Sequence, residues 1–591
     1  MSTEGQIIRR LYRSSVVSIV IAAVAAMFGM LIDGVIIGKF LGTDCMAAYG
    51  LVTPLFSIMT AISGVLAAGS QIYCAKYLGA GKTERARQVF SACMVITVII
   101  AAAAIVILLL FCEPLCVIMG AKKNAAHLLP YTKDYLYGIA PGILPVLLLF
   151  IFNALMRLDG DPDRVIWAVI VMTVFDIVGD LLVALVLHAG MAGMGISTAL
   201  SYYAALAVLL LHFRKPDIIF RFSMKDIQWN DLKEIFTTGA PTAVGSVSTM
   251  IRNLLLNLIM VSVASSTAVA ALSVRNTLNT LFGSILLGIG MTTTMIAGMV
   301  YGEEDKSSAR HLMQVSLRYA LGFGLALAVL AFAAADPLVM LFASGKEDSV
   351  QMAAYAVRAM RIYAFGLPLY GINMVFVNYL QGIGRLRLAN LISVLDNLIF
   401  VTAIAWIFSP VLGMTAVWIS YPIGEVLVLL SVFIAAFREH KQIPRTPDDM
   451  LFLPDGFGVS EEDTYERSFR TVSEVMTASE ELDGFMKAHQ ASPKEKMLIP
   501  LCVEEMAKNV VEHGIAQGKK DSSAELRVVK KNEDWIIRVR DNCKAFDPKQ
   551  WIHIHNPEDP SANIGIRMVC GMAKDVKYVN AMQLNTLIIK V

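Results

Sequence analysis

Three aspartates interrupt apolar stretches of this 591-residue sequence, where a charged group is costly. Asp33 lies near the end of the first stretch, and Asp176 and Asp180 lie in the fifth, at an i,i+4 spacing that puts both on one face of a helix. A carboxyl group in a poorly solvated cavity can take up a proton near working pH, or Na⁺ in its place, and so drive a conformational change. The alternative is structural: Asp33 would lie at the membrane surface, and Asp176 or Asp180 would satisfy a neighbouring backbone group or arginine.

A second set of polar residues interrupts the later apolar stretches. These amide and guanidinium groups could line the path of an anionic substrate. Arg252 and Arg275 could equally pair with Asp396 or Glu425 as structural ties, which is the interpretation we favour. The candidate cavity residues are Arg252, Asn253, Asn257, Arg275, Asn276 and Asn373.

The last part of the chain carries residues suited to nucleotide chemistry. In VEEMAKNVVEHG, Glu505, Asn509 and His513 share one helix face. The Asn509 oxygen could hold Mg²⁺, and Glu505 could act as the catalytic base that polarises water toward a γ-phosphate. Asp541 ends a strand where it could accept from an adenine amino group, and Gly565 opens a helix where phosphate could approach the amides. A solvated polar helix face is the simpler alternative for the first three residues.

The elements that position these residues are mostly membrane helices. The chain is 56% hydrophobic, with a mean hydropathy of +0.62, which is too apolar for a single water-soluble core. A spanning helix needs about 20 mostly apolar residues. Twelve stretches meet this condition, centred near residues 25, 60, 100, 147, 177, 206, 255, 285, 326, 372, 399 and 428.

An internal repeat organises these helices. Residues 46–87 return as residues 269–310, so that Gly79 corresponds to Gly302 at an offset of 223. Two halves of six helices each would enter the bilayer in the same direction and face each other across a central cleft, as in alternating-access carriers. We therefore expect six-helix bundles over residues 1–222 and 223–440, a linker over 441–453, and a soluble domain over 454–591.

The charge pattern predicts the orientation and separates the soluble domain. Lys and Arg gather on one side of the predicted helices, which the positive-inside rule assigns to the cytoplasm. We expect a multi-pass protein of the plasma membrane with both termini in the cytoplasm and no nucleic-acid partner. Residues 446–591 hold 19 Lys and Arg against 24 Asp and Glu, and they alternate helix and strand signals, which predicts an acidic α+β domain.

Residues 10–440 resemble the multidrug and toxic compound extrusion (MATE) family, and the DinF-like branch in particular. The similar segments are IDGVIIGKFLGTDCMAAYGLVTP, KYLGAGKTERAR, FDIVGDLLVALVLHAGMAGMGISTALS, GAP and SILLGIG. The resemblance implies export of organic or drug-like compounds in exchange for H⁺ or Na⁺, with Asp33 and Asp180 at the cation-coupling positions and Asp176 where the motif usually has Asn. The chain departs from the family's first-helix proline and glutamine, because Ser18 and Ala26 stand there.

The soluble domain resembles the GHKL ATP-binding fold of histidine kinases and anti-sigma-factor kinases, an α+β sandwich. The resemblance implies Mg-ATP as cofactor, with Asn509 as the Mg²⁺ ligand, Glu505 as the base, Asp541 as the adenine contact and Gly565 as the lid glycine. The family's DxGxG element is here Asp541-Asn-Cys543-Lys-Ala545, without either glycine. We therefore expect nucleotide binding with weak or degenerate ATPase or kinase activity.

These observations predict an exporter of small organic compounds in the lipid bilayer, whose soluble domain binds nucleotide or a cytoplasmic regulatory protein. Two alternatives stay open: a membrane receptor with a serine-kinase-like signalling tail, and a flippase for lipid-linked intermediates with a basic cavity. The sequence does not determine the substrate, the coupling ion or the oligomeric state.

Overall fold

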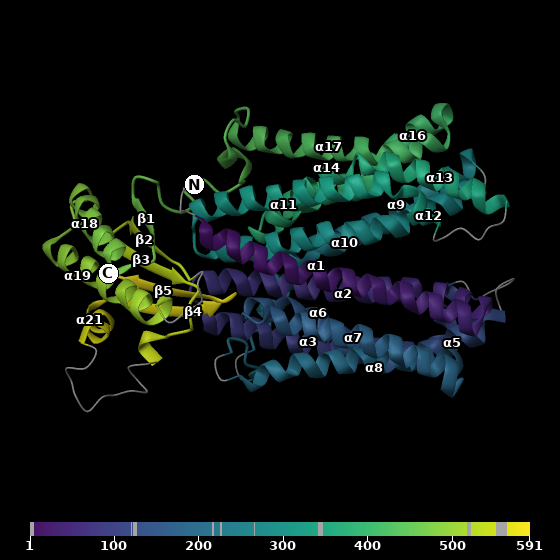
Figure 1. The fold of residues 1–591 in the computed structure, drawn as a ribbon, viewed down its shortest axis with the longest axis horizontal. Coiled ribbons are helices and arrows are strands. Elements are labelled where there is room, and N and C mark those ends of the chain that lie inside the picture. The colour runs from purple at the N-terminus through teal and green to yellow at the C-terminus, as the bar shows by residue number, and fades with distance from the viewer. Residues whose placement is uncertain are drawn as a thin grey trace.

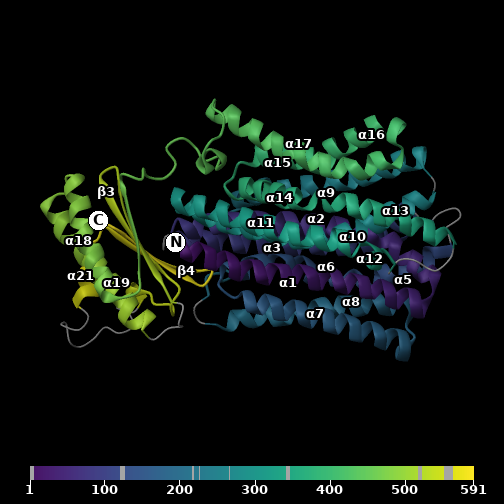
Figure 2. The same cartoon turned by 45° about the horizontal axis from the view of Figure 1, so that its top comes forward.

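A computed structural model describes most of the chain, in two parts. Long helices run side by side in one part, and a sheet covered by helices caps one of its ends (Figure 1). The two chain termini lie at that same end, as the turned view in Figure 2 also shows. The described residues are 5–119, 121, 127–215, 218–224, 227–264, 266–340, 347–516, 522–550 and 564–591.

The helical part consists of two lobes, which we call the first and the second lobe. The first lobe comprises α1 (Gln6–Ile36), α2 (Thr43–Gly79), α3 (Thr83–Leu110), α4 (Cys112–Met119), α5 (Leu129–Ile139), α6 (Ile143–Leu158), α7 (Pro162–Leu182) and α8 (Gly190–Leu210). The second lobe comprises α9 (Asn230–Val263), α10 (Ser266–Gly302), α11 (Lys306–Ala333), α12 (Ala335–Met340), α13 (Glu347–Ala364), α14 (Leu367–Gly382), α15 (Leu386–Val394), α16 (Phe400–Leu412) and α17 (Met414–His440).

The helix boundaries reproduce the predicted repeat. Helices α2 and α10 both have 37 residues, and they begin and end 223 positions apart (266 − 43 and 302 − 79). Helices α3 and α11 both have 28 residues and are related by the same offset (306 − 83 and 333 − 110). The internal repeat found in the sequence is therefore a repeat of the structure.

The number of spans found is close to the predicted twelve. Ten of the described helices are long and apolar enough to cross a membrane, and α13 with α14 makes an eleventh if the two, bent by 55°, form one span. The 31-residue α1, predicted as the first span, is not in this set. Its Ser18 hydroxyl donates to the carbonyl of Pro162 at 3.3 Å, whereas the side chain of Ala26 lies outside the described residues.

Helices of the two lobes meet at backbone contact distance at four glycines, Gly69, Gly79, Gly239 and Gly302, which we call the glycine seam. A Cβ atom on Gly69 would lie 2.0 Å from the carbonyl oxygen of Ile235, and one on Gly239 would lie 2.1 Å from that of Val65. Because a real Cβ does not come so close to backbone, only glycine permits this helix spacing. The seam lies in the halves of α2, α9 and α10 that are nearer the soluble domain.

The soluble domain is a five-stranded antiparallel sheet with helices on one face. Its elements are β1 (Thr464–Phe469), α18 (Val472–Ala488), α19 (Pro493–Asn509), β2 (Ala524–Lys531), β3 (Asp534–Asp541), α21 (Ile564–Met572), β4 (Asp575–Ala581) and β5 (Leu584–Lys590). The strand order is β1-β2-β3-β5-β4. The predicted alternation of helices and strands is present in this domain.

Strand alternation gives the sheet two different faces. In β2 and β3, Leu526, Val528, Ile537 and Val539 belong to the core beneath the helices. The intervening side chains, including Arg527 and Arg538, project from the opposite face. That face points toward the membrane helices (Figure 1).

Candidate functional site

The three predicted coupling aspartates converge inside the first lobe. Asp33 of α1 is 5% exposed, and Asp176 and Asp180 of α7 are 8% and 1% exposed. The carboxyl groups of Asp33 and Asp176 lie within hydrogen-bonding reach of each other when one carries a proton. Asp33 is therefore buried with the other two and does not lie at an exposed helix end.

Hydroxyl groups of α8 and nearby tyrosines surround this carboxyl cluster. Helices α7 and α8 are so close that a Cβ on Gly179 would lie 2.4 Å from Ser197 Oγ. The hydroxyls of Ser197, Thr198 and Ser201 lie near Asp176 and Asp180, but each donates to a backbone carbonyl. The tyrosines near the cluster are Tyr49, Tyr135 and Tyr202, each of which interacts electrostatically with Asp33 or Asp176.

The cluster nevertheless has unused hydrogen-bonding capacity. One carboxyl oxygen each of Asp33 and Asp176, and both oxygens of Asp180, are buried without a hydrogen-bond partner among the described residues. Buried carboxylate oxygens without partners are strongly unfavourable unless they hold a proton or a cation. The arrangement can therefore bind H⁺ or Na⁺.

The second lobe contains a further carboxyl pair, Asp396 and Glu425, which are 6% and 8% exposed. The two groups lie within hydrogen-bonding reach of each other, and Arg252 acts on both electrostatically. Asn373 Nδ2 donates to Glu425 Oε2 at 2.8 Å and to its carbonyl at 2.9 Å. From the sequence, Asp396 and Glu425 were expected only as partners for arginines, and their proximity to each other was not predicted.

Arg275 is stacked between aromatic rings. Its guanidinium carbon lies 4.2 Å from the ring centre of Tyr363 and 3.4 Å from that of Tyr421, and the residue is 1% exposed. Its Nη1 donates to Asn276 Oδ1 at 3.0 Å, whereas Nη2 has no partner in the described part of the chain. Cation–π contact thus replaces the ion pair that we favoured for Arg275.

The remaining candidate cavity residues differ in exposure. Arg252 and Asn253 are partly buried, Asn257 is exposed, and Asn373 is fully buried against Glu425. Arg252 also lies 5.6 Å from the ring of Tyr421. The buried members of this set are held inside the second lobe and do not line an open surface.

The predicted nucleotide residues also come together. Glu505 and Asn509 lie one turn apart on α19, and a Cβ on Gly565 of α21 would lie 1.8 Å from Glu505 Oε2. After Asn509 the chain continues as a π-helix, η9 (Val510–Ile515), with i→i+5 hydrogen bonds. Only the step from Glu505 to Asn509 is therefore α-helical, and His513 lies in the π-helical segment.

Asp541 ends β3 and is 6% exposed. Its Oδ1 accepts from Asn585 Nδ2 at 2.7 Å and from the backbone N–H of Cys543 at 2.8 Å. Burial raises the pKa of this carboxyl, against the effect of those donors. The Cys543 side chain points toward Gly514, where a Cβ would lie 3.0 Å from its Sγ.

These residues fit a nucleotide in part. The Asn509 side chain is partly exposed and has no recorded partner in the described residues, so its oxygen is available to Mg²⁺. The Cys543 side chain packs against Gly514 and therefore does not extend freely from the end of β3. The Glu505 carboxyl, however, covers Gly565 and would have to turn away before a phosphate could approach that backbone.

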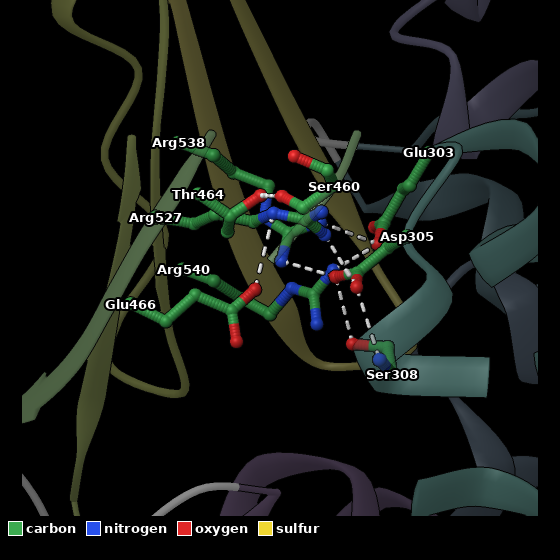
Figure 3. Close-up of polar contacts among 9 residues, drawn as sticks. All are labelled: Glu303, Asp305, Ser308, Ser460, Thr464, Glu466, Arg527, Arg538 and Arg540. Carbon is green, nitrogen blue, oxygen red and sulfur yellow. Dashed lines mark hydrogen bonds and ion pairs between the residues drawn. The ribbon is translucent and has the colours of Figure 1, made fainter. Parts of the chain in front are cut away.

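A buried ion-pair network joins the soluble domain to the second lobe (Figure 3). Glu303 and Asp305, in the turn between α10 and α11, are 2% and 1% exposed at their side chains. Arg538 donates to Glu303 at 2.9 Å and to Asp305 at 2.5 Å, while Arg540 pairs with Glu303 and Arg527 with Asp305. The acidic turn thus inserts among three arginines of the sheet.

Asp305 is also the N-cap of α11. Its carboxylate accepts hydrogen bonds from the backbone N–H and the hydroxyl of Ser308 at 3.0 and 2.8 Å. Burial would raise the pKa of Asp305, but Arg538, Arg527 and Arg540 hold it well below its usual value. The carboxylate is therefore charged throughout the neutral range.

The soluble domain also contacts the first lobe. The N–H of Met582, in the β4–β5 turn, donates to the carbonyl of Leu158 at 2.8 Å, and Gln583 Nε2 donates to that of Gly160 at 3.3 Å. Lys577 packs on Gly81, where a Cβ would lie 3.0 Å from its side chain. The soluble domain therefore bridges both lobes, next to the glycine seam.

This junction was not predicted from the sequence, although the sequence contains a signal for it. The segment Gly79-Ala-Gly-Lys82 in the first repeat corresponds to Gly302-Glu-Glu-Asp305 in the second. The second repeat thus has three acidic residues in a turn where the first repeat has none. The segment WIIRVRD carries arginines at alternate positions, and the two features together indicate a charged docking surface.

Family comparisons agree with this architecture. The MatE family matches residues 18–182 and 241–407, which is more than half of the chain. The histidine kinase-like ATPase domain matches residues 470–591.

Individual relatives give the same result. A probable multidrug resistance protein NorM of Bradyrhizobium diazoefficiens is 26% identical over 425 residues, covering 69% of this chain and 88% of that protein. The multidrug export protein MepA of Staphylococcus saprophyticus is 22% identical over 403 residues, covering 67% of this chain and 87% of that protein.

Solved structures share the fold of the helical part. A multidrug resistance MATE family transporter in its outward-facing conformation superimposes with a TM-score of 0.68 at 22% identity, covering 73% of this chain and 96% of that one. A MOP superfamily transporter of Pyrococcus furiosus, described as having a binding pocket of reversed polarity, also gives 0.68 at 22% identity, covering 74% and 97%.

Proposed function

The chain belongs to the MatE family, and we propose that it is an antiporter that exports organic, drug-like compounds across the plasma membrane in exchange for H⁺ or Na⁺. Its relatives NorM and MepA carry the names of multidrug resistance and export proteins, which supports this substrate class. Both termini and the soluble domain lie on the cytoplasmic side in this proposal.

The carboxyl cluster carries the coupling. Asp33, Asp176 and Asp180 are buried together in the first lobe, with four oxygens that lack partners among the described residues. A cation bound there neutralises the negative charge of these carboxylates, which is otherwise unfavourable because they are buried away from water. The DinF-like branch carries its coupling carboxylates in the first lobe, and we propose on this ground that the chain belongs to that branch.

Alternating access uses the glycine seam as the cytoplasmic gate. The structure corresponds to the state with the seam closed, since α2 meets both α9 and α10 at backbone contact distance. Opening toward the cytoplasm requires the lobes to separate there. The substrate enters between the lobes, near the polar residues of α9 and α10 such as Arg252, Asn253 and Asn257.

The soluble domain restrains this separation of the lobes, and we call this restraint the brake. It is bonded to the second lobe through Glu303 and Asp305 and to the first lobe through Leu158 and Gly160. Separation of the lobes must break one set of these contacts. We propose that a nucleotide, held by Asn509 and Asp541, changes the strength of docking without measurable turnover, because Glu505 covers the phosphate approach at Gly565.

A transport assay tests this function. Purified full-length protein in proteoliposomes should export a cationic dye when a proton gradient or a sodium gradient is imposed, and one of the two ions should suffice. Transport that is independent of both gradients would remove the coupling proposal while leaving family membership intact.

A further inference from the structure

A basic cavity lies where α1, α11 and the soluble domain meet. Its volume is about 470 Å³, and five of its nine lining residues are arginines. No aspartate or glutamate is among these lining residues. We call it the arginine cavity and define it by Arg9, Arg10, Arg13, Arg318 and Arg470.

Three separate parts of the chain supply these arginines. Arg9 and Arg13 lie one turn apart on α1, and Arg318 lies on α11. Arg470 lies just before Thr471, the N-cap of α18 in the soluble domain. Arg470 reaches across to Gln6 Oε1 at 3.4 Å, which ties the soluble domain to the start of α1. Convergence from three segments distinguishes this cavity from the row of basic residues that borders an ordinary membrane helix.

The guanidinium groups have capacity for a ligand. Arg9 Nε is buried without a partner in the described residues. Arg13, Arg318 and Arg470 are exposed, and no ion pair is recorded for them in the described part of the chain. Five arginines and no carboxylate line the cavity, so its field is positive and favours an anion.

We propose that the arginine cavity binds an anion with two or more clustered phosphate groups. The planar guanidinium fork donates two parallel hydrogen bonds to phosphate, so several forks around one cavity favour several phosphates. A cavity of about this volume suits a small-molecule ligand. Tyr319, which also lines the cavity, offers an aromatic surface for a base or an acyl chain.

Two sources can supply this chemistry. Helix α11 has 28 residues, more than the roughly 20 that cross the hydrocarbon, so its first turns extend past the membrane and the cavity lies near headgroup depth. The phosphates could belong to a free cytoplasmic polyphosphate or to a lipid headgroup. The Asn509 and Asp541 site is a different one, since α19 and α21 cover the other face of the sheet.

Binding to the full-length chain distinguishes the sources. Tripolyphosphate, without Mg²⁺ or adenine so that the Asn509 site is not addressed, is titrated in detergent at fixed salt by calorimetry. In parallel, hydrogen exchange of residues 5–13 is measured in nanodiscs of phosphatidylcholine with or without a bisphosphorylated inositol lipid. The variants are Arg13→Gln and Arg470→Gln, whose exposed side chains are not needed for folding, and the control is the exposed Arg214→Gln.

Each outcome decides the proposal. Tripolyphosphate affinity that falls at least tenfold in both variants but not in the control supports a soluble ligand. Protection by the lipid alone that is lost in both variants but not in the control supports a headgroup. If neither probe depends on Arg13 and Arg470, or if Arg214→Gln weakens binding equally, the proposal is wrong.

Discussion

Gly79 and Gly302 occupy equivalent positions in the two repeats and pack reciprocally against each other's helices. A Cβ on Gly79 would lie 2.1 Å from the carbonyl oxygen of Met299, and a Cβ on Gly302 would lie 2.0 Å from that of Lys76. The pseudo-twofold relation between the lobes therefore passes through this crossing of α2 and α10. The proposed gate is therefore a contact of backbone with backbone, and no side chain there can move to make room for a larger residue.

We expect Gly302→Ala to prevent full closure of the seam. The methyl group meets backbone, so α2 and α10 must move apart at a cost of about 1–3 kcal/mol. Export in proteoliposomes should fall about tenfold, and residues 72–79 should exchange amide hydrogen faster. The control is Gly322→Ala on α11, where a Cβ meets nothing within 4 Å. Equal effects of both substitutions would show that the crossing is not a gate.

Reversing charge at the junction should release the brake. Arg538→Glu places a third acid beside Glu303 and Asp305, and an unpaired buried charge there costs about 3–5 kcal/mol. We expect faster hydrogen exchange over residues 299–306 and 534–541, together with a higher export rate. The exposed Lys487→Glu on α18 serves as the control. Unchanged export with a detached domain would exclude the brake.

Docking should be insensitive to pH in the neutral range. The pKa of Asp305 is depressed in the docked state, so its contribution is fully present above the usual value near 3.8 and is lost only as pH falls below it. The protection factors of residues 299–306, which are exchange rates corrected for the intrinsic effect of pH on amide exchange, should stay constant from pH 8 to about 5. Asp305→Asn should weaken docking at pH 7 already. Release between pH 8 and 6 would mean that another group controls the junction.

Nucleotide binding should depend on Asn509. We expect Asn509→Ala to abolish binding of Mg²⁺ with a non-hydrolysable ATP analogue in calorimetry, because no other side chain of that face offers an amide oxygen. The exposed Glu480→Gln variant should bind normally. Turnover should stay at background in the wild-type protein. Binding that survives Asn509→Ala, or turnover abolished by Glu505→Gln, would contradict this assignment.

The architecture was accessible from the sequence because a repeat and an apolar pattern are local signals. The offset between Gly79 and Gly302 predicted that α2 and α10 are equivalent helices, and the spacing of Asp176 and Asp180 predicted that they share one helix face. The convergence of Asp33 with them followed from the family resemblance and not from spacing, since no local rule brings α1 next to α7.

The features that could not be predicted depend on packing between distant segments. The π-helix after Asn509 is one such feature, because the i,i+4,i+8 spacing of Glu505, Asn509 and His513 assumes a continuous α-helix. The stacking of Arg275 between Tyr363 and Tyr421 joins three helices, and the contacts of Arg538 with Glu303 join two domains. Both contacts need a tertiary structure, although the acidic turn alone was visible in the sequence.

Cation-driven export in proteoliposomes that carry Asp180→Asn tests the central claim most directly. The matched control is Asp163→Asn, at the exposed first turn of the same helix. We predict that Asp180→Asn inserts normally and loses gradient-driven export at least tenfold, while Asp163→Asn retains it. Export by Asp180→Asn at the wild-type rate under the same gradient would contradict the account.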